Sequence, residues 1–348
     1  MDGSDNEAAS RVEPTIAVIG AGSIGGATAA MLARSGHSVE IVCKHDRLAE
    51  KIRRQGIDLS GRLGSARVRM PAVAKVGELS GRKDIVFLAT KAQDMAAPAR
   101  ELLPFLTDGS LVVSLQNGIC IDALSEIIGR NRVVGCIVGW GSTMRDDGSI
   151  EVTSSGSYVV GRPDGVVDAP LKQIAALLSD ILPTRITTNI YGALYSKLMI
   201  NACINSIGAL SGLPMGAMLA ERRVPRIFQA ILREAEGVAR AARIVVEPYS
   251  GQFKLYRIIT GAGPFSTALS GFFSLLVRLL GYGDVRPSTL QSIERGRTTE
   301  IDWLNGYLVE LGRLHGAATP VNERIVEMVK EIEQGRRAIG TANLDDLY

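Results

Sequence analysis

Histidine is scarce in this sequence: only His37, His45 and His315 occur among 348 residues. His37 precedes a strand-like run, His45 follows the same run, and His315 ends an amphipathic stretch, so each is expected to be structural or solvent-exposed. Histidine is the side chain that most often moves protons near neutral pH. A proton donor, if the chain needs one, is therefore expected among other residue types.

Cysteine is also rare. Cys43, Cys120, Cys136 and Cys203 each stand singly in apolar surroundings. None has a second cysteine at the spacing used by zinc sites or by redox pairs. We therefore expect no metal site, and we interpret the four thiols as reduced core residues of a cytoplasmic protein.

Strong charge of one sign is absent as well. Lysine and arginine number 39 and aspartate and glutamate 36, a net charge of +3, without a basic run or a basic and aromatic pattern. A nucleic-acid partner is therefore not expected. Residues 1–14 are polar and acidic and lack the apolar segment of a signal peptide, which predicts a flexible tail.

Long apolar runs are missing with one exception, PFSTALSGFFSLLVRLLGYG at residues 264–283. This run contains Arg278 as well as serines and glycines, which a membrane-spanning helix disfavours. We interpret it as a buried helical element or a lid, and we expect no membrane association.

What is present points to an ordinary globular protein. The composition is 46% apolar and 22% charged, and the length suffices for two domains. Residues 15–44 show the pattern strand, glycine turn, helix, strand, and further strand-like runs follow at 84–90, 110–116 and 132–140. Strands that alternate with helices predict a mostly parallel sheet, that is, a Rossmann-type α/β domain.

The pattern changes after about residue 145. Residues 149–162 look like a β-hairpin, residues 171–182 like one more amphipathic helix, and the chain from residue 189 onward is helical almost throughout. We therefore predict an all-α second domain. The predicted divisions are a flexible tail at 1–14, the α/β domain at 15–188 and the helical domain at 189–348, with a helix continuing through 331–340 and a loose end at 341–348.

The glycine turn GAGSIG places Gly20, Gly22 and Gly25 in the spacing G-x-G-x-x-G, with Ser23 and Ile24 between them. The motif follows a predicted strand and opens a predicted helix, which is the context that makes it credible. The first glycine allows a tight turn, the second lets the backbone approach a pyrophosphate, and the third packs the helix on the strand. We predict a dinucleotide site here.

The identity of the dinucleotide is suggested by the end of the second strand, where NAD enzymes place an acidic residue on the ribose. This chain has Lys44 there, and an ammonium suits a 2′-phosphate, so NADP(H) is favoured. Glu40 lies too early, inside the strand. Asp46 keeps NAD open as the alternative.

A polar stripe runs along the apolar stretch YSKLMINACINS. Lys197, Asn201 and Asn205 are spaced four residues apart, so at about 100° per residue they project from nearly the same helix face. Unpaired polar groups are costly inside a protein, so the stripe must be paired or must face a cleft. Partial burial lowers a lysine pKa toward values useful for proton transfer, which makes Lys197 the candidate proton donor.

Several blocks of this sequence resemble the ketopantoate reductase family. They are GAGSIG, TKAQD at 90–94, LQNG at 115–118, KLMINACIN at 197–205 and the long run PSTLQSIERGRTTEIDWLNGYLVELGRLHGAATPVN at 287–322. The order is right and nearly the whole chain is covered. The resemblance implies NADPH-dependent reduction of a small-molecule 2-oxo acid, 2-dehydropantoate, to pantoate, with NADP binding in the first domain and substrate binding in the second.

The resemblance also implies residue roles. Lys197 would be the general acid that protonates the substrate C2 oxygen as hydride arrives, and Glu300 would hold the substrate hydroxyl or the lysine. Ser288 would bind substrate oxygens. The residues implied for substrate binding are Asn117, Asn201, Asn205 and Ser288, and those for cofactor binding are Gly20, Gly22, Ser23, Ile24, Gly25, Lys44, Lys91, Asn117 and Glu300.

Structural roles remain open for some of these residues. Ser288 could only cap its helix, Lys197 could form a salt bridge with Glu300, and Lys91 could be a solvated lysine at a strand end. Where many family members carry polar residues, this chain has Met215 and Val285, so its pocket could accept a bulkier or more apolar 2-oxo acid.

Other functions and a possible partner complete the expectations. A related dehydrogenase of 3-hydroxy acids or polyol phosphates would also join a Rossmann domain to a helical one. A noncatalytic NADPH-binding sensor is the alternative outside enzymes. The helical domain and its apolar insert make a homodimer plausible.

Overall fold

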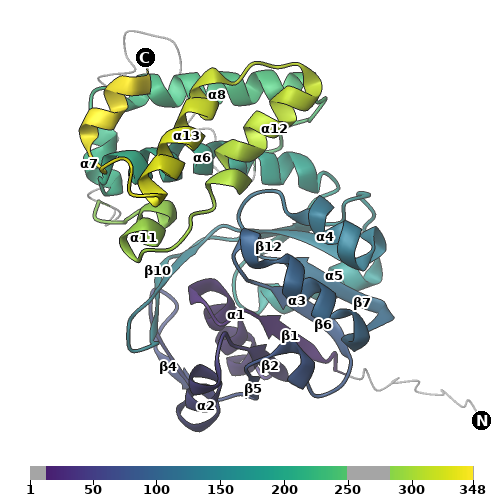
Figure 1. Cartoon of the computed structure of the whole chain (residues 1–348). Helices are drawn as coiled ribbons and strands as arrows, with labels where there is room; N and C mark the ends of the chain where they lie inside the picture. The colour runs from purple at the N-terminus through teal and green to yellow at the C-terminus, as the bar shows by residue number, and fades with distance from the viewer. Residues whose placement is uncertain (1–12, 249–282, 348) are drawn as a thin grey trace, which may run out of the picture.

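The computed structural model of the chain describes residues 13–248 and 283–347, which form an α/β half and a helical half (Figure 1). All strands of the described part lie between Ile16 and Ile186, and from Ile190 onward its elements are helical. The predicted fold class is therefore confirmed.

The main sheet has eight strands in the order β12-β11-β8-β7-β6-β1-β2-β5. β1 pairs in parallel with β2 and β6, and the parallel ladder continues through β7 to β8. β11 pairs with β8 in antiparallel orientation, and β12 pairs in parallel with β11, so the sheet is mixed at this edge. The strand bounds are β1 Ile16–Ile19, β2 Val39–Val42, β5 Ala72–Val73, β6 Lys83–Leu88, β7 Leu106–Ser114, β8 Val133–Val138, β11 Tyr158–Gly161 and β12 Thr184–Ile186.

A second, four-stranded sheet has the order β4-β3-β10-β9. Its strands are β3 Ile57–Gly61, β4 Ala66–Val68, β9 Gly141–Met144 and β10 Ile150–Ser154. The predicted hairpin at 149–162 is wrong, because β10 pairs with β9 and β3 in this sheet while β11 pairs with β8 in the main sheet. Alternating apolar residues show which face of a strand is buried but not which strand lies beside it.

The helices of the α/β half cover the sheet, and both helices that the sequence predicts in this half are present. α1 starts within the glycine turn, at Ser23, and ends before Gly36, whose φ of +96° suits a helix stop. The predicted helix at 171–182 is confirmed as α5. The bounds are α1 Ser23–Arg34, α2 Asp46–Gln55, α3 Ala96–Glu101, α4 Ile121–Ile128 and α5 Ala169–Ser179.

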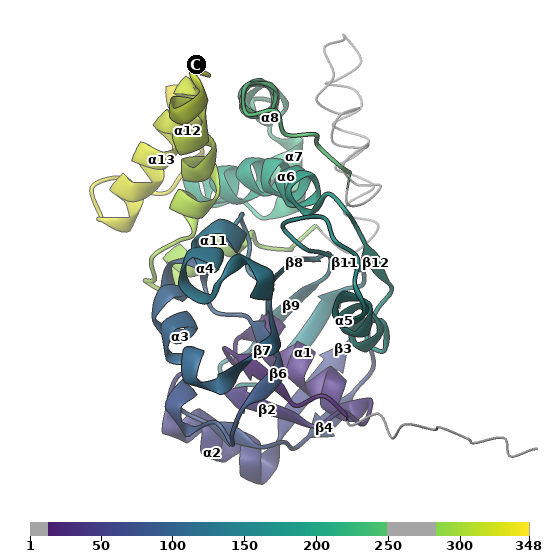
Figure 2. The ribbon, with the colours of Figure 1, turned by 90° about the vertical axis from the view of Figure 1, so that its right-hand side faces the viewer.

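The helical half is organised around α6, which spans Ile190–Ser211 and is buried on nearly all sides. Figure 2 shows α6 between the main sheet and α8, and contacts with both support this placement. The other elements are α7 Met215–Ala220, α8 Val224–Ala241, α11 Ser288–Glu294, the 3₁₀ turn η5 Ile301–Trp303, α12 Asn305–His315, α13 Pro320–Glu333 and the 3₁₀ turn η6 Thr341–Leu347.

Membrane insertion finds no support in the helices that the structure describes, since none is both long and apolar enough to cross a bilayer. The apolar run at 264–283 lies almost wholly outside the described residues.

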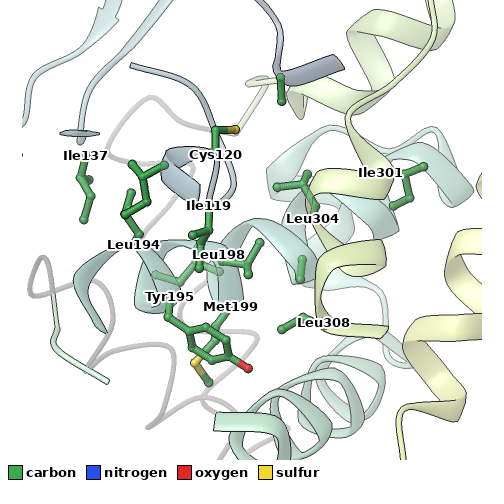
Figure 3. Close-up of a cluster of buried hydrophobic side chains, with 14 of the residues drawn as sticks. Ile119, Cys120, Ile137, Leu194, Tyr195, Leu198, Met199, Ile301, Leu304 and Leu308 are labelled. Atoms are coloured by element: carbon green, nitrogen blue, oxygen red, sulfur yellow. The ribbon is translucent and has the colours of Figure 1, made fainter. Parts of the chain in front are cut away.

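One apolar core crosses from the sheet into the helical half (Figure 3). Ile137 of β8 faces α6, where Leu194 and Leu198 are buried, and the same cluster reaches Leu304 and Leu308 at the start of α12. Burial of a leucine or isoleucine side chain contributes about 1.5–3 kcal/mol. The two halves are therefore held together by hydrophobic packing as well as by polar contacts.

The C-terminal end of the chain is packed, so the prediction of a loose segment at 341–348 is wrong for its described part. α13 ends at Glu333, and Gly335 turns the chain with a φ of +68°, so the predicted helix through 331–340 also stops early. Leu344 of η6 is fully buried. Leu347 is buried as well, and η6 packs against α6.

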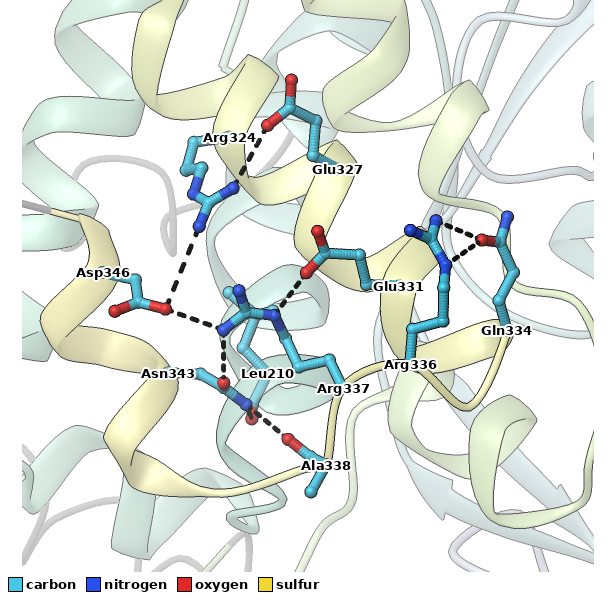
Figure 4. Close-up of polar contacts among 10 residues, drawn as sticks. All are labelled: Leu210, Arg324, Glu327, Glu331, Gln334, Arg336, Arg337, Ala338, Asn343 and Asp346. Carbon is cyan, nitrogen blue, oxygen red and sulfur yellow. Dashed lines mark hydrogen bonds and ion pairs between the residues drawn. The ribbon is translucent and has the colours of Figure 1, made fainter.

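Arg337 fixes the same end through charged hydrogen bonds (Figure 4). Its guanidinium donates to Glu331 at 2.6 Å, to Asn343 at 2.9 Å and to Asp346 at 2.7 Å. The Asn343 amide in turn donates to the Leu210 carbonyl of α6 at 2.9 Å.

Candidate active site

The glycine turn between β1 and α1 has the shape that a dinucleotide site needs. Gly20 has a φ of +105°, which other residues rarely adopt, and a Cβ on Gly25 would lie 2.0 Å from the Gly20 carbonyl oxygen. A Cβ on Gly22 would meet nothing within 4 Å. Two glycines thus allow close packing, while Gly22 borders open space at the start of α1.

The first turn of α1 fits an anion in that space. Ser23 and Ile24 are the first residues of the helix, and no acidic residue occurs in the first turn. Backbone N–H groups at a helix start lack partners within the helix and attract phosphate oxygens. These features agree with the predicted pyrophosphate position.

Lys44 lies exposed two residues beyond the end of β2, where the ribose of a bound dinucleotide is expected. It makes no hydrogen bond or ion pair with the residues that the structure describes. Asp46 opens α2, and His45 caps that helix by accepting from the Leu48 N–H at 3.3 Å. Glu40 lies buried inside β2, as predicted, where it forms an ion pair with Lys83 at 2.7 Å.

Residues from several strands meet α6 at the carboxyl edge of the main sheet. Lys91 follows β6, Asn117 follows β7, and Val138 ends β8. The Lys197 ammonium of α6 donates a hydrogen bond to the Val138 carbonyl oxygen at 2.9 Å. Open parallel sheets bind ligands at this edge, and Gly22 also lies there because it follows β1. The fold therefore brings the candidate proton donor to the edge that carries the glycine turn.

Burial lowers the pKa of Lys197 from its ordinary value of 10.5 to about 8. The nearby Glu300 carboxylate acts in the opposite direction, but desolvation dominates. The Cys136 thiol on β8 stays protonated, because burial raises its pKa to about 12. At neutral pH Lys197 is thus a charged ammonium that can release a proton more readily than a solvated lysine.

Asn205 and Ser288 are joined directly. The Ser288 backbone N–H and hydroxyl both donate to the Asn205 side-chain oxygen, each at 3.2 Å. Ser288 is the first residue of α11, and Pro287 precedes it at the cap position. The hydroxyl makes no capping bond to α11 and instead connects this helix to the polar stripe of α6.

Glu300 faces Lys91 across the two halves of the protein. The Lys91 ammonium donates to the Glu300 carboxylate at 2.9 Å, and the Ala92 backbone N–H donates to its other oxygen at 3.2 Å. The Glu300 side chain is 5% exposed and that of Lys91 45%. The suggested salt bridge between Glu300 and Lys197 is absent among the described residues, since Glu300 pairs with Lys91.

Two amides of the predicted site are left with bonding capacity for a ligand. The side chains of Asn117 and Asn201 are half-buried and form no hydrogen bond with the described residues. Next to Asn117, Gly118 has a φ of +82° and a Cβ there would lie 2.5 Å from the Trp303 carbonyl, so this turn rests against η5. Half-buried amides without partners are suited to bind polar groups of a small molecule.

The three histidines take structural or exposed positions. His37 contacts Asp180 at 2.8 Å, His45 caps α2, and His315 lies exposed at the end of α12. All four cysteines are buried with free thiols. In the described part of the chain no three histidine, cysteine, aspartate or glutamate side chains lie close enough to share a metal ion.

Sequence reasoning missed the contacts that involve backbone or distant partners. The Val138 carbonyl has no side-chain signature. The pairing of Lys91 with Glu300 joins residues 209 positions apart. Gln116 was passed over, although it follows β7 and donates to the Thr90 hydroxyl at 3.2 Å; its place inside the LQNG block was the available signal.

Comparisons with known proteins match both halves. The family model described as ketopantoate reductase PanE/ApbA matches residues 16–165, and the one described as its C-terminal part matches residues 189–333. The 2-dehydropantoate 2-reductase of Aquifex aeolicus is 28% identical over 320 residues, covering 91% of this chain and 96% of the relative. That of Archaeoglobus fulgidus is 25% identical and covers 92% and 98%.

Solved structures agree in fold. A PanE/ApbA family ketopantoate reductase from Ralstonia eutropha superposes with a TM-score of 0.77 at 25% identity, covering 93% of this chain and all of that one. D-mandelate dehydrogenase in a ternary complex with NADH and anilino(oxo)acetate gives 0.78 at 21% identity, covering 92% and 99%, and shows the same fold. The two family models together span both halves of the fold, and the chain therefore belongs to the ketopantoate reductase family.

Proposed function

We propose that this protein reduces 2-dehydropantoate to pantoate with NADPH. The observation that carries the proposal is the position of Lys197 at the carboxyl edge of the sheet, with its pKa lowered to about 8 and its ammonium held by the Val138 carbonyl. The names of the Aquifex aeolicus and Archaeoglobus fulgidus relatives support the substrate. When bound, NADPH supplies the hydride.

The residues of this chain would divide the remaining work. Lys197 donates a proton to the C2 oxygen as that oxygen gains negative charge, which general acid catalysis makes about 10²- to 10⁴-fold faster. An ammonium has three N–H donors, and Val138 occupies one of them, so two remain for substrate. Asn205 and Ser288 offer polar groups to substrate oxygens, and Asn201 extends the same helix face.

Glu300 would bind the substrate hydroxyl. Its carboxylate is kept in place by Lys91 and the Ala92 N–H, and a carboxylate oxygen has lone pairs left to accept a further hydrogen bond. Asn117 and Lys91 would contact the cofactor along the sheet edge, and Gly20, Gly22, Ser23, Ile24 and Gly25 would hold its pyrophosphate.

The direct test follows NADPH oxidation with a panel of 2-oxo acids that includes 2-dehydropantoate and acids with bulkier apolar chains. We expect 2-dehydropantoate to give the highest kcat/KM. A higher kcat/KM for an apolar acid would instead indicate that Met215 and Val285 adapt the pocket to a more apolar substrate. If no 2-oxo acid is reduced, the proposed reaction is wrong.

The reduction should slow at alkaline pH. Lys197 must be protonated to act as the acid, so kcat/KM is expected to be level below pH about 8 and to fall about tenfold per pH unit above it. The same lysine must be unprotonated to accept a proton from pantoate, so the reverse reaction should rise over the same range. Measuring both directions across pH checks the sign, and a rate that is constant through this range would contradict the assignment.

Lys44→Asp is expected to raise the KM for NADPH about tenfold with little change in kcat, because an exposed charged contact to the 2′-phosphate is lost and a repulsion is added. The KM for NADH should change little, since NADH lacks that phosphate. Lys172→Asp, at an exposed lysine of α5, is the control for the change in net charge. An unchanged ratio of the two KM values would remove Lys44 from cofactor selection.

The remaining expectations are proposals of the same kind. We assign NADP binding to residues 15–188 and substrate binding to residues 189–348, and we place the protein in the cytoplasm. A homodimer is expected through the helical half, and sedimentation of the purified protein would detect it.

A further inference from the structure

The peptide unit between Val138 and Gly139 is hydrogen-bonded at both ends. Its carbonyl oxygen accepts from the Lys197 ammonium at 2.9 Å, and its N–H, which belongs to Gly139, donates to the Ser157 carbonyl at 2.9 Å. An amide engaged on both sides is polarised and oriented more firmly than one with a single partner. The peptide whose carbonyl accepts the hydrogen bond from Lys197 is thus itself anchored to a second chain segment, at Ser157.

That anchoring depends on two glycines. The chain leaves the main sheet after β8 through Gly139 and returns to it before β11 through Gly156. A Cβ on Gly156 would lie 2.0 Å from the Gly139 carbonyl oxygen, and a Cβ on Gly139 would lie 2.6 Å from the Ser157 carbonyl oxygen. The atoms in the way are backbone atoms, which cannot rotate aside as a side chain can. The two segments can cross at this distance only because neither residue has a Cβ.

The groups that face the Lys197 ammonium are few. Cys136 lies two residues before Val138 on β8, and its protonated thiol carries no charge. Glu300 approaches from the turn before η5, but Lys91 and the Ala92 N–H already bind its oxygens. Within the described residues, the ammonium is hydrogen-bonded to the Val138 carbonyl. This carbonyl therefore contributes more than Cys136 or Glu300 to the position of the ammonium.

We propose that Gly139 and Gly156 are positioning residues for proton transfer, an inference that rests on the proposed function. By letting two backbone segments cross in contact, they fix the Val138 carbonyl, and this carbonyl holds the Lys197 ammonium at the sheet edge with two N–H donors free. In this proposal the two glycines need no contact with substrate or cofactor. They act through the peptide and the lysine.

The test uses Gly139→Ala and Gly156→Ala in the full-length protein. Loss of a hydrogen bond to a charged group predicts a fall in kcat of about 10- to 100-fold in each variant. The KM for NADPH should stay within about twofold, because the glycine turn lies on other strands. The pKa of Lys197, followed by NMR of isotope-labelled lysine, should drop by about one unit, since the charged form loses an acceptor.

Gly109→Ala is the matched control, since Gly109 lies in β7 and a Cβ there meets nothing within 4 Å. It should change neither kcat nor the lysine pKa. If Gly139→Ala and Gly156→Ala bind NADPH normally and keep both the kcat and the Lys197 pKa of the unaltered protein, the inference is wrong. If the unaltered protein reduces no 2-oxo acid, the proposed function fails instead, and the NMR measurement still decides whether the two glycines place the lysine.

A second variant covers the case in which the alanines do not fold. Replacing Gly139 by glycolic acid through semisynthesis turns the 138–139 amide into an ester, which adds no carbon atom, removes the N–H and weakens the carbonyl as an acceptor. The same fall in kcat and in the lysine pKa is expected. An unchanged kcat and an unchanged Lys197 pKa in this ester protein would overturn the inference. Because the ester adds no carbon atom, a steric clash could not explain the result.

Discussion

Lys197→Ala is expected to lower kcat for 2-dehydropantoate by about 10²- to 10⁴-fold, the usual contribution of a positioned general acid. NADPH should still bind, because the glycine turn and Lys44 lie on other elements. The fall above pH about 8 should disappear from the residual activity, since the group that titrates there is gone. Steady-state rates across pH, together with direct NADPH binding, measure all three effects.

The control for this variant is Lys172→Ala, which removes an exposed lysine from α5 and should leave kcat unchanged. A small primary amine added to the Lys197→Ala protein should restore part of the rate, because it can occupy the vacated space and donate a proton. Full turnover by Lys197→Ala would exclude it as the proton donor, whatever the fate of the substrate assignment.

Gly25→Ala is expected to destabilise the protein by about 3 kcal/mol or more and to abolish NADPH binding. Its Cβ would lie 2.0 Å from the Gly20 carbonyl oxygen and 2.8 Å from the Ala89 Cβ, so α1 would have to move away from β1. Overpacking a core typically costs about 1–3 kcal/mol, and backbone that cannot rotate aside raises the cost. Against a total stability of about 5–15 kcal/mol this is a large loss. Denaturant unfolding and NADPH titration provide the measurement.

Two neighbouring glycines separate packing from binding. Gly26→Ala places its Cβ against the far end of the flexible Ile150 side chain, so the free energy of unfolding should change by no more than about 1 kcal/mol. Gly22→Ala faces open space and should leave stability unchanged while weakening NADPH binding. If Gly25→Ala were as stable as Gly26→Ala, the close contact between α1 and β1 would not limit this turn.

The order of elements could be predicted because the sequence signals it locally. The glycine turn, the β-branched runs of β6, β7 and β8, and the long apolar stretch of α6 each specify an element from neighbouring residues. The polar stripe of Lys197, Asn201 and Asn205 was identified by its period of four, which is also a local property. Local patterns of this kind suffice for fold class and for the helix that carries the candidate acid.

Pairings between distant segments could not be obtained in this way. β10 and β11 have the alternation of a hairpin, yet they belong to different sheets, because β10 pairs with β9 and β3 while β11 pairs with β8. Glu300 lies near enough to Lys197 to affect its pKa, but its hydrogen-bonded partner is Lys91, 209 residues earlier in the chain. Every residue of any sequence has a backbone carbonyl, so nothing in the sequence marks that of Val138. Its role follows only from its position beside Lys197.

The course of α6 ties catalysis to folding. One apolar cluster holds the sheet residue Ile137, the α6 residues Leu194 and Leu198, and Leu308 of α12, and Lys197 lies between those two α6 leucines along the chain. The position of Lys197 therefore depends on packing between the two halves of the protein and not on one half alone. Heat or denaturant that loosens this cluster should therefore displace Lys197, so activity should be lost together with the packing of α6 against the sheet.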